Sequence, residues 1–336
     1  MADRPRSAIV LSPSWPGWRW HAAHVPEIDW HFFNDAPRNE LERRAPRALV
    51  RLRACTEAVL AAKRLDACAI FAHGHEYATP CLAELEALRC DVPVVVVAYN
   101  YVRLPTGVRL KLARRLLPRA ARLFIASEME RDLYSQAFGI DKRRLEMERW
   151  SLDRVEEPPG EPLEPGRYVC SIGGNARDYE TLLAAARLLP DIPFVIVARP
   201  GNLGQAVLPA NVRVRYNLPF DQAMNVLAHS AFMALPLLGS EVPCGHVTLV
   251  AAMHRAKPFI VTDSRGVADY VNGEQHSLSV PPGDAAALAA AIERLWSDPE
   301  LCARMAERAL AFARSYCSTE NAIAQLRRLL GEFGAL

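Results

Sequence analysis

The chain has 336 residues, enough for two domains with separate cores, and its 51% hydrophobic and 23% charged residues are typical of a globular protein. No apolar run reaches the roughly 18–20 residues of a membrane helix, so we expect no spanning helix. The first residues lack the apolar core of a signal peptide, and the eight cysteines contain no Cys-x-x-Cys pair. We therefore expect reduced, mainly structural thiols and a cytoplasmic protein.

The formal net charge of +2 hides an asymmetry between the halves of the chain. Residues 1–150 contain 24 Lys and Arg against 18 Asp and Glu, a net charge of +6, and the remaining residues contain 16 against 20, a net charge of −4. The function should explain the basic first half, and an anionic partner would do so.

Short apolar runs alternate with helix-like segments through the first half. Each run is apolar throughout, which is typical of strands buried on both faces of a parallel sheet. A loop dense in aromatic residues, including Trp15, Trp18 and Trp20, follows the first run. We expect strands at residues 8–11, 28–33, 66–72, 92–98 and 123–126, and helices at 48–64, at 107–117 and after the candidate N-cap Ser127.

A stretch rich in proline separates the halves at residues 156–166. Its prolines and glycines cannot form a helix or an interior strand, so we predict a linker between a first domain at 1–155 and a second at 167–336. The strand and helix pattern then resumes. We expect strands at 168–172, 194–198, 212–216, 232–238 and 258–262, and helices at 180–189, 220–228, from His246 onward, and from Asp284 to Trp296. The sequence predicts an α/β protein with two doubly wound domains.

The stretch at residues 239–253 joins two apolar runs through a polar loop with glycine and a helix. Val247, Val250 and Met253 stand at the three-residue spacing of one buried helix face. Free backbone N–H groups at such a helix start, together with the helix dipole, favour an anion such as phosphate. No lysine follows Gly245, so the loop is not a P-loop of the ATP-binding type.

This stretch resembles the donor-site motif of retaining GT-B glycosyltransferases of the family-four type, the glycosyl transferases group 1. The resemblance is carried by Glu241, Pro243 and Gly245, by the helix residues 252–253, by residues 257–260 and by residues 266–269, and it covers about residues 165–315 well. Two positions depart from the motif. Glu241 lies two residues before Pro243 instead of next to it, and Ala251 replaces the glutamate that holds the ribose hydroxyls in the family.

The resemblance implies the GT-B fold, in which two Rossmann-like domains face a cleft and the last helix crosses back to the first domain. It implies a retaining sugar transfer, without metal or other cofactor, from a nucleotide-diphosphate sugar, with UDP favoured over GDP, to an acceptor glycan or glycolipid. The basic first half favours a lipid-linked or anionic acceptor, and we expect no nucleic-acid partner. By resemblance, Glu241 contacts the donor sugar, and the donor phosphates meet the N–H groups of Gly245, His246 and Val247. The alternative for Glu241 is an exposed loop acid, and Thr248 either adds a hydroxyl to the phosphates or only stabilises the first turn of the helix.

A second candidate for the donor phosphates follows the first predicted strand of the second domain. Gly173 and Gly174 allow a diphosphate to approach the backbone, and Asn175 comes next. Arg177 offers a two-pronged donor for phosphate, at the place where the family has lysine. The alternative is a surface turn with a solvated arginine. Ligands bind at the carboxyl edge of an open α/β sheet, which favours the functional interpretation and a role for Arg177 in catalysis.

Two histidines, His73 and His75, and Glu76 follow a predicted strand of the first domain. This grouping suggests metal binding or acid–base chemistry. No second cluster of ligands and no Asp-x-Asp motif completes a metal site, so we expect His73 or His75 to contact the acceptor or the sugar. The alternative is a polar turn at the strand end.

A basic helix in the first half is a candidate for contact with an anionic membrane, at the inner face in a cytoplasmic protein. The alternative is a solvated helix face. The cations concerned are Arg109, Lys111, Arg114 and Arg115.

Two other functions stay open from the sequence. A non-catalytic protein or regulatory subunit that binds nucleotide sugars would fit Ala251. A nicotinamide-dependent oxidoreductase is less well supported, because no predicted strand runs into a Gly-x-Gly-x-x-Gly turn.

Overall fold

A computed structural model describes residues 5–14, 19–101, 103–152, 160–271 and 273–336. The contacts divide the chain into two units, Met1–Glu148 with Glu320–Leu336 and Arg149–Thr319, called unit 1 and unit 2 below. Part of the predicted linker, residues 153–159, lies outside the described residues. Its later part packs on unit 2, where the buried carboxylate of Glu164 accepts a hydrogen bond from Arg215 at 2.5 Å.

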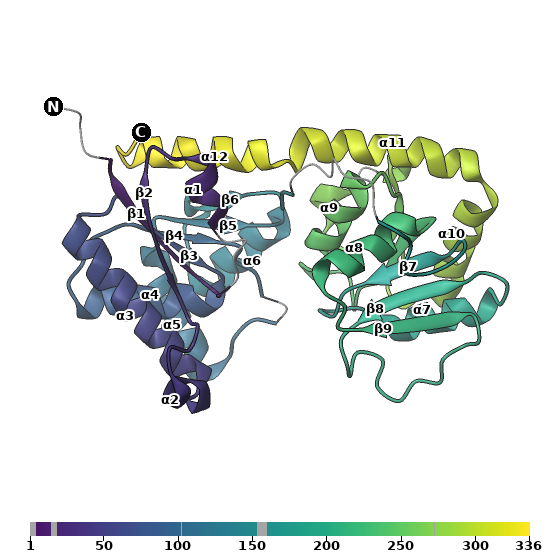
Figure 1. The fold of residues 1–336 in the computed structure, drawn as a ribbon, viewed down its shortest axis with the longest axis horizontal. Coiled ribbons are helices and arrows are strands. Elements are labelled where there is room, and N and C mark those ends of the chain that lie inside the picture. Colours follow the sequence, from purple (N-terminus) through teal and green to yellow (C-terminus); the bar gives the residue numbers. More distant parts are fainter. Residues whose placement is uncertain (1–4, 15–18, 102, 153–159, 272) are drawn as a thin grey trace. The chain divides into compact units, whose positions relative to one another are not determined.

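Unit 1 is built on one six-stranded sheet with the strand order β2-β1-β3-β4-β5-β6 (Figure 1). Every pairing is parallel, which confirms the prediction from the apolar runs. The last strand, β6, was not predicted because it is only three residues long. The strands are β1 (Ser7–Ser12), β2 (Asp29–Asn34), β3 (Ile70–His73), β4 (Val94–Val97), β5 (Arg122–Ile125) and β6 (Leu145–Met147).

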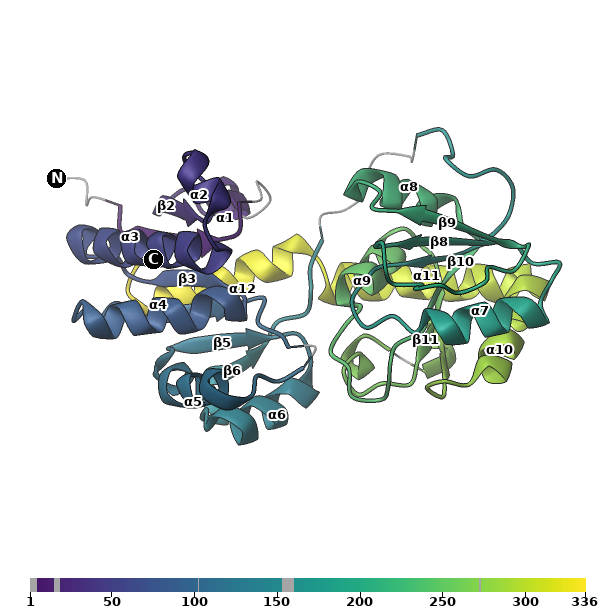
Figure 2. The same cartoon turned by 90° about the horizontal axis from the view of Figure 1, so that it is seen from below.

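Helices cover both faces of this sheet. One face packs against α3, α4, α5 and α6, and the other against α1 and the C-terminal helix α12 (Figure 2). The aromatic loop predicted after the first apolar run is wrong at its end, because Trp20 and His21 open α1. Trp15 and Trp18 lie outside the described residues. The helices are α1 (Trp20–His24), α2 (Glu40–Arg44), α3 (Arg47–Leu65), α4 (His75–Ala87), α5 (Gly107–Leu116), α6 (Glu128–Phe138) and α12 (Thr319–Glu332).

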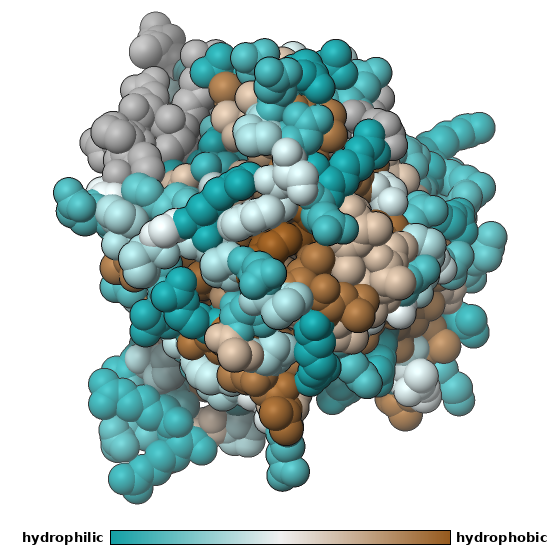
Figure 3. Space-filling model, turned by 90° about the vertical axis from the view of Figure 1, so that its right-hand side faces the viewer, coloured by the Kyte–Doolittle hydropathy of each residue, from teal (hydrophilic) through white to brown (hydrophobic). Residues whose placement is uncertain are grey.

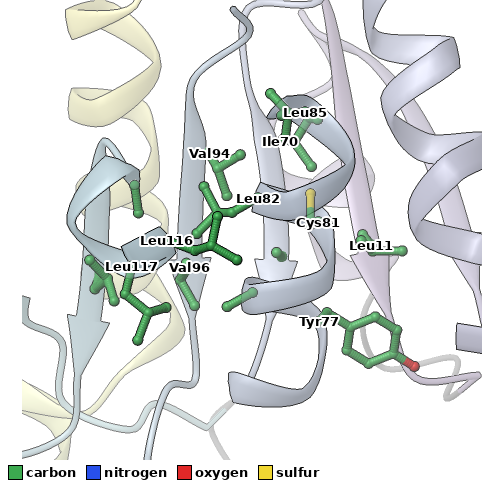
Figure 4. Packing of buried hydrophobic residues seen from close by; sticks show 14 of the residues in the cluster. Leu11, Ile70, Tyr77, Cys81, Leu82, Leu85, Val94, Val96, Leu116 and Leu117 are labelled. Atoms are coloured by element: carbon green, nitrogen blue, oxygen red, sulfur yellow. The ribbon is translucent and has the colours of Figure 1, made fainter. Parts of the chain in front are cut away.

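The core of unit 1 fixes the start of α4 at the end of β3. Cys81, Leu82 and Leu85 of α4 lie over Ile70 of β3 and Val94 of β4, all of them buried (Figure 4). This packing sets where the chain leaves the sheet and turns into the helix, so the residues at the carboxyl end of β3 have fixed positions.

Unit 2 is built on a second parallel sheet, with the order β12-β11-β10-β7-β8-β9. One face packs against α8, α9 and α11 and the other against α7 and α10. Mainly hydrophilic side chains cover the face seen in Figure 3, with hydrophobic ones in small groups between them. The elements are β7 (Val169–Ile172), α7 (Tyr179–Leu188), β8 (Phe194–Ala198), β9 (Val212–Tyr216), α8 (Phe220–His229), β10 (Phe232–Leu235), α9 (His246–His254), β11 (Phe259–Thr262), β12 (Ser277–Val280), α10 (Ala285–Ser297) and α11 (Pro299–Tyr316).

The strand order of unit 2 reverses between β7 and β10, which lie side by side in its centre. The chain runs from β7 to β8 on one side of the sheet and from β10 to β11 on the other side. The loops that follow β7 and β10 therefore diverge and leave room for a ligand between them. Short 3-10 helices complete the two units at Leu117–Arg119, Lys142–Arg144, Ala268–Tyr270 and Gly273–Gln275.

The helix that follows β10 differs from its prediction. The sequence pattern predicted one buried face, but α9 is buried nearly all round, and only Val247 among its residues is partly exposed. The helix lies between the sheet and α11, so both of its sides meet protein. The preceding strand ends at Leu235, earlier than the predicted Leu238.

Candidate functional site

The loops after β7 and β10 meet at one buried arginine. The guanidinium of Arg177, in the loop after β7, donates to the backbone oxygens of Ile172 at 3.1 Å and Asn175 at 2.8 Å. It also donates to Oγ1 of Thr248, in the first turn of α9, at 3.1 Å. The two stretches selected separately from the sequence therefore form a single site at the strand-order reversal.

The positive charge of Arg177 has no counter-charge in the described part of the protein. Only 8% of the residue is exposed, its three hydrogen-bond acceptors are neutral, and no Asp or Glu of the described residues pairs with it. Burial lowers the pKa of the guanidinium. Since a buried charge without a partner is costly, this arrangement favours an anion as ligand.

The start of α9 adds backbone donors beside this cation. Gly245 is the N-cap residue, with a φ of 106°, and as a glycine it has no side chain with which to cap the helix. The first N–H groups of an uncapped helix have no acceptor within the helix, and the helix dipole makes this end positive. The hydroxyl of Thr248 donates to the Gly245 oxygen at 2.9 Å while it accepts from Arg177, so it holds the helix start against the cation.

The ring of His246 has a structural task. It is 4% exposed, and its Nε2 lies 2.7 Å from the backbone oxygen of Gly266. Burial lowers the pKa of the ring to about 4, and the nearby charge of Arg177 contributes. The ring is therefore neutral at pH 7, and Nε2 is the protonated nitrogen because it faces a carbonyl oxygen. What His246 offers to a ligand is its backbone N–H.

Gly173 leaves no room for a side chain beside Arg177. A Cβ atom there would lie 2.5 Å from the Arg177 guanidinium, and the φ of 126° is one that L-residues rarely adopt. A Cβ atom on Gly174 would lie 2.7 Å from the side chain of Arg199. Both glycines therefore let arginine side chains lie directly against the backbone.

Arg199 is a site residue that the sequence reasoning missed. It follows β8, and its Nη1 donates to Oδ1 of the exposed Asn175 at 2.9 Å. Its charge acts on Arg177, since it contributes to the lowered pKa of that residue. The only signal in the sequence was an arginine directly after a strand, next to the strand that carries the glycines.

Glu241 lies apart from this cluster of contacts. Its carboxylate pairs with Arg265 at 2.9 Å, and both side chains are more than half exposed. The loop that carries it is tied to the turn after β11, where Arg265 N–H donates to the Ser240 oxygen at 2.8 Å. In this conformation Glu241 is engaged by Arg265.

The two histidines of unit 1 have different surroundings. His73 ends β3 and is 4% exposed, with its ring edge-on to that of His21 at 5.8 Å, and burial lowers its pKa well below the usual value. His75 opens α4 and is partly exposed, with its ring 4.3 Å from that of Tyr101; burial lowers its pKa as well. Among the described residues, no group of three His, Cys, Asp or Glu side chains could hold a metal ion.

The basic helix of unit 1 uses two of its four candidate cations internally. Arg114 donates to the backbone oxygen of Ala137 at 2.8 Å, and Arg115 forms an ion pair with Glu86. Arg109 lines a pocket described below, whereas Lys111 is exposed. No helix within the described residues is long and apolar enough to span a bilayer.

Comparisons with known proteins agree with the fold of the chain. Residues 167–298 match the profile of the family Glycosyl transferases group 1. A search of curated proteins found no match.

Solved structures cover nearly the whole chain. Sucrose-phosphate synthase from Thermosynechococcus elongatus superimposes with a TM-score of 0.75 at 15% identity, covering 98% of this chain and 99% of its own. A glycosyltransferase from Rickettsia africae gives a TM-score of 0.71 at 12% identity, with 98% and 99% covered. Anabaena HepE in complex with UDP-glucose gives 0.71 at 16% identity, with 97% and 99% covered.

These likenesses, at identities this low, concern the fold. Together with the matched profile and the two parallel six-stranded sheets, they identify the architecture. The chain has the GT-B fold, and its residues 167–298 resemble the glycosyl transferases group 1 family.

Proposed function

We propose that the chain is a retaining glycosyltransferase whose nucleotide-diphosphate sugar binds in unit 2 at Arg177 and the start of α9. One observation carries the proposal: Arg177 is a buried cation without a carboxylate partner among the described residues, joined through Thr248 to an uncapped helix start. A diphosphate supplies the missing negative charge to both groups.

The proposed catalysis is electrostatic. The bond between the sugar C1 and the diphosphate oxygen breaks, and negative charge grows on the diphosphate as it leaves. Arg177 and the N–H groups of His246 and Val247 stabilise that charge. As in the family, the acceptor oxygen attacks on the face that the diphosphate leaves, and a diphosphate oxygen takes the acceptor proton, so the configuration at C1 is retained.

The proposed donor is a UDP-hexose. Anabaena HepE has been solved with UDP-glucose, and its fold matches that of this chain over nearly its full length. Gly173, Gly174 and Asn175 would lie along the diphosphate, with Arg199 as a second cation at its edge. Glu241 would reach the sugar after it exchanges Arg265 for a sugar hydroxyl, a small cost because the pair is exposed.

The proposed acceptor is a glycan or glycolipid bound by unit 1, and His75 is its proposed contact. His73 is buried, so it would affect acceptor binding only indirectly, by its packing at the end of β3. We also propose that α5 contacts an anionic membrane and that the protein is cytoplasmic. Arg109 and Lys111 are the cations of that group that form no ion pair within the described residues, whereas Arg114 bonds the Ala137 oxygen and Arg115 pairs with Glu86.

A second candidate function is binding of the nucleotide sugar without transfer. It is favoured by Ala251, which is 2% exposed and replaces the glutamate that holds the ribose in the family. With that contact missing, the donor would be held by its diphosphate and base, and a regulatory subunit would need no more than this.

Two measurements on one panel separate the two functions. Thermal unfolding with UDP, GDP, UDP-glucose, UDP-N-acetylglucosamine and GDP-mannose should show the largest stabilisation for a UDP-sugar, because a ligand that binds the folded state raises its stability. Proton NMR of that donor with the enzyme should then show slow hydrolysis or transfer with the anomeric configuration retained. Stabilisation without any turnover would favour the binding protein, and no stabilisation by any nucleotide would refute both.

A further inference from the structure

Unit 1 contains a pocket of about 900 Å³ at the carboxyl ends of β3 and β4. This is within the range of roughly 300–1,000 Å³ for small-molecule sites. The pocket lies between α4, Tyr101 with residues 103–106, and α5, and one residue of α3 reaches it. All its lining residues belong to unit 1, so its shape is set within one folded unit.

The lining of this pocket is positively charged. Arg51, Arg103 and Arg109 line it together with one acid, Glu76. Arg51 is already compensated, because its guanidinium lies 3.3 Å from Glu76 and 3.8 Å from Asp35. Arg103 and Arg109 have no acidic partner within the described residues, so two positive charges are in excess at the pocket.

The N-terminal ends of two helices add to the positive electrostatic potential of the pocket. α4 begins after the N-cap residue Gly74 and α5 after the N-cap residue Thr106, and neither of these two residues caps its helix with a side chain. The first turn of α5 contains no acidic residue, so its dipole is uncompensated at the end where Arg109 lies. Arg103, Arg109 and the start of α5 therefore mark one end of the pocket as the anion end.

The remainder of the lining suits a sugar. Tyr101 presents an aromatic ring beside His75, whose pKa is lowered by burial, so the imidazole is a neutral hydrogen-bonding group at pH 7. Thr79, Thr106 and Glu76 offer further polar groups, while Pro80, Leu104 and Val108 are apolar. An aromatic face with a few polar groups is a common way to orient a polyhydroxylated ring.

One wall of the pocket is held by a buried network. The backbone N–H of Tyr101 donates to the hydroxyl of Tyr134 at 2.9 Å, and that hydroxyl donates to the carboxylate of Glu130 at 2.6 Å. Glu130 also accepts the backbone N–H of Ser127 at 3.0 Å, closing the capping box of α6. The backbone at Tyr101 is thus held in place by this network, which prepares the pocket before a ligand arrives.

From these observations we infer that the pocket binds a sugar that carries an anionic group, phosphate or carboxylate, held by Arg103 and Arg109 at the start of α5. As the acceptor half of the reaction, this inference rests on the proposed function. The binding of the anion itself requires no donor, so it can be measured separately.

The experiment is calorimetric titration of the full chain, without nucleotide and at low salt, with glucose 6-phosphate, glucuronate and glucose. At least one anionic sugar should bind, and glucose should bind at least about tenfold more weakly. The double variant R103A/R109A should lose about tenfold or more in affinity for the anionic sugar. The matched control is R64A/R143A, which removes two exposed cations of unit 1 outside the pocket and should bind like the wild type.

A parallel titration with vesicles identifies the source of the anion. If phosphatidylglycerol vesicles bind, R103A/R109A abolishes that binding, and no anionic sugar binds, the two arginines contact an anionic membrane surface and the sugar assignment is overturned. Equal affinity for glucose and the anionic sugars, equal losses in the two double variants, or no binding of any anionic probe would overturn it. UDP binding to R103A/R109A should be unchanged, so a failure of the donor site is seen independently.

Discussion

Replacing Arg177 by methionine tests the donor site most directly. A guanidinium has five N–H groups, and three hydrogen bonds to Ile172, Asn175 and Thr248 leave two for a ligand. Charge-assisted hydrogen bonds contribute about 1.5–3 kcal/mol each. Loss of both should weaken UDP binding by about 3 kcal/mol or more, which is at least about 100-fold in Kd.

The variant should still fold, because two effects on the ligand-free protein oppose one another. Arg177→Met removes a buried charge without a counter-charge, which stabilises the folded state. It also leaves the carbonyl oxygens of Ile172 and Asn175 without this donor, at about 1–3 kcal/mol for each acceptor that water does not reach. We therefore expect a ligand-free unfolding temperature near that of the wild type.

Thermal unfolding with UDP at 100 times the wild-type Kd measures the effect. The wild type should gain about 2.7 kcal/mol and the variant, with a 100-fold weaker Kd, about 0.4 kcal/mol. At about 2–4 °C per kcal/mol for a domain of this size, the shifts are about 5–11 °C and about 1–2 °C. Arg187→Met is the matched control, since Arg187 is exposed on α7 and bonds the Val207 oxygen. A full UDP shift in Arg177→Met would refute the donor site.

Three further changes test the packing around the two candidate sites. Gly173→Ala should weaken UDP binding and lower stability by about 1–3 kcal/mol, because its Cβ would displace Arg177; Gly201→Ala, also at positive φ but with nothing within 4 Å of its Cβ, should leave UDP binding unchanged. His246 has a folded pKa of about 4, below the usual 6.5, so the folded state binds fewer protons and this residue should lower wild-type stability by up to about 3 kcal/mol as the pH drops from 6.5 to 4. Urea unfolding of His246→Gln, which keeps a donor for Gly266, should show a fall that is smaller by this amount, since the buried His73 still contributes the same kind of fall. Burial raises the pKa of Glu130 to about 7 from 4.5, so the folded state binds more protons and stability should decrease as the pH rises from 4.5 to 7. Glu130→Gln should remove that decrease. An unchanged dependence of stability on pH in the variant would contradict the raised pKa of Glu130.

The strands of the two sheets could mostly be predicted from the sequence, whereas the short elements could not. Fully apolar runs such as 92–98 and 194–198 specify buried parallel strands, and both were found within two residues of the predicted ends. β6 and β12 carry too few apolar residues in a row to be seen. The buried surroundings of α9 were missed because α11, which covers its outer side, lies about 50 residues further along the chain, and local periodicity contains no such contact.

The grouping of Arg177 with the start of α9 could be predicted, because both follow strands whose carboxyl ends meet at one sheet edge. The pairing of Glu241 with Arg265 could not, since it depends on how two loops fold against each other. Arg199 was missed for a similar reason. Arg199 lies over Gly174 because β7 and β8 are paired side by side in the sheet. The sequence alone shows only an arginine before a proline.

The strand orders of the two units explain why their candidate sites lie at different places. In unit 2 the order reverses between β7 and β10, and glycines keep that gap open for Arg177. In unit 1 it reverses between β1 and β3, but there His73 is buried against the buried ring of His21. Since side chains fill that position, the space for a ligand lies one strand further, between the ends of β3 and β4, where His75 and Tyr101 line the pocket. A histidine after β3 is thus able to meet a ligand only from the first turn of α4, which favours His75 over His73 as the contact.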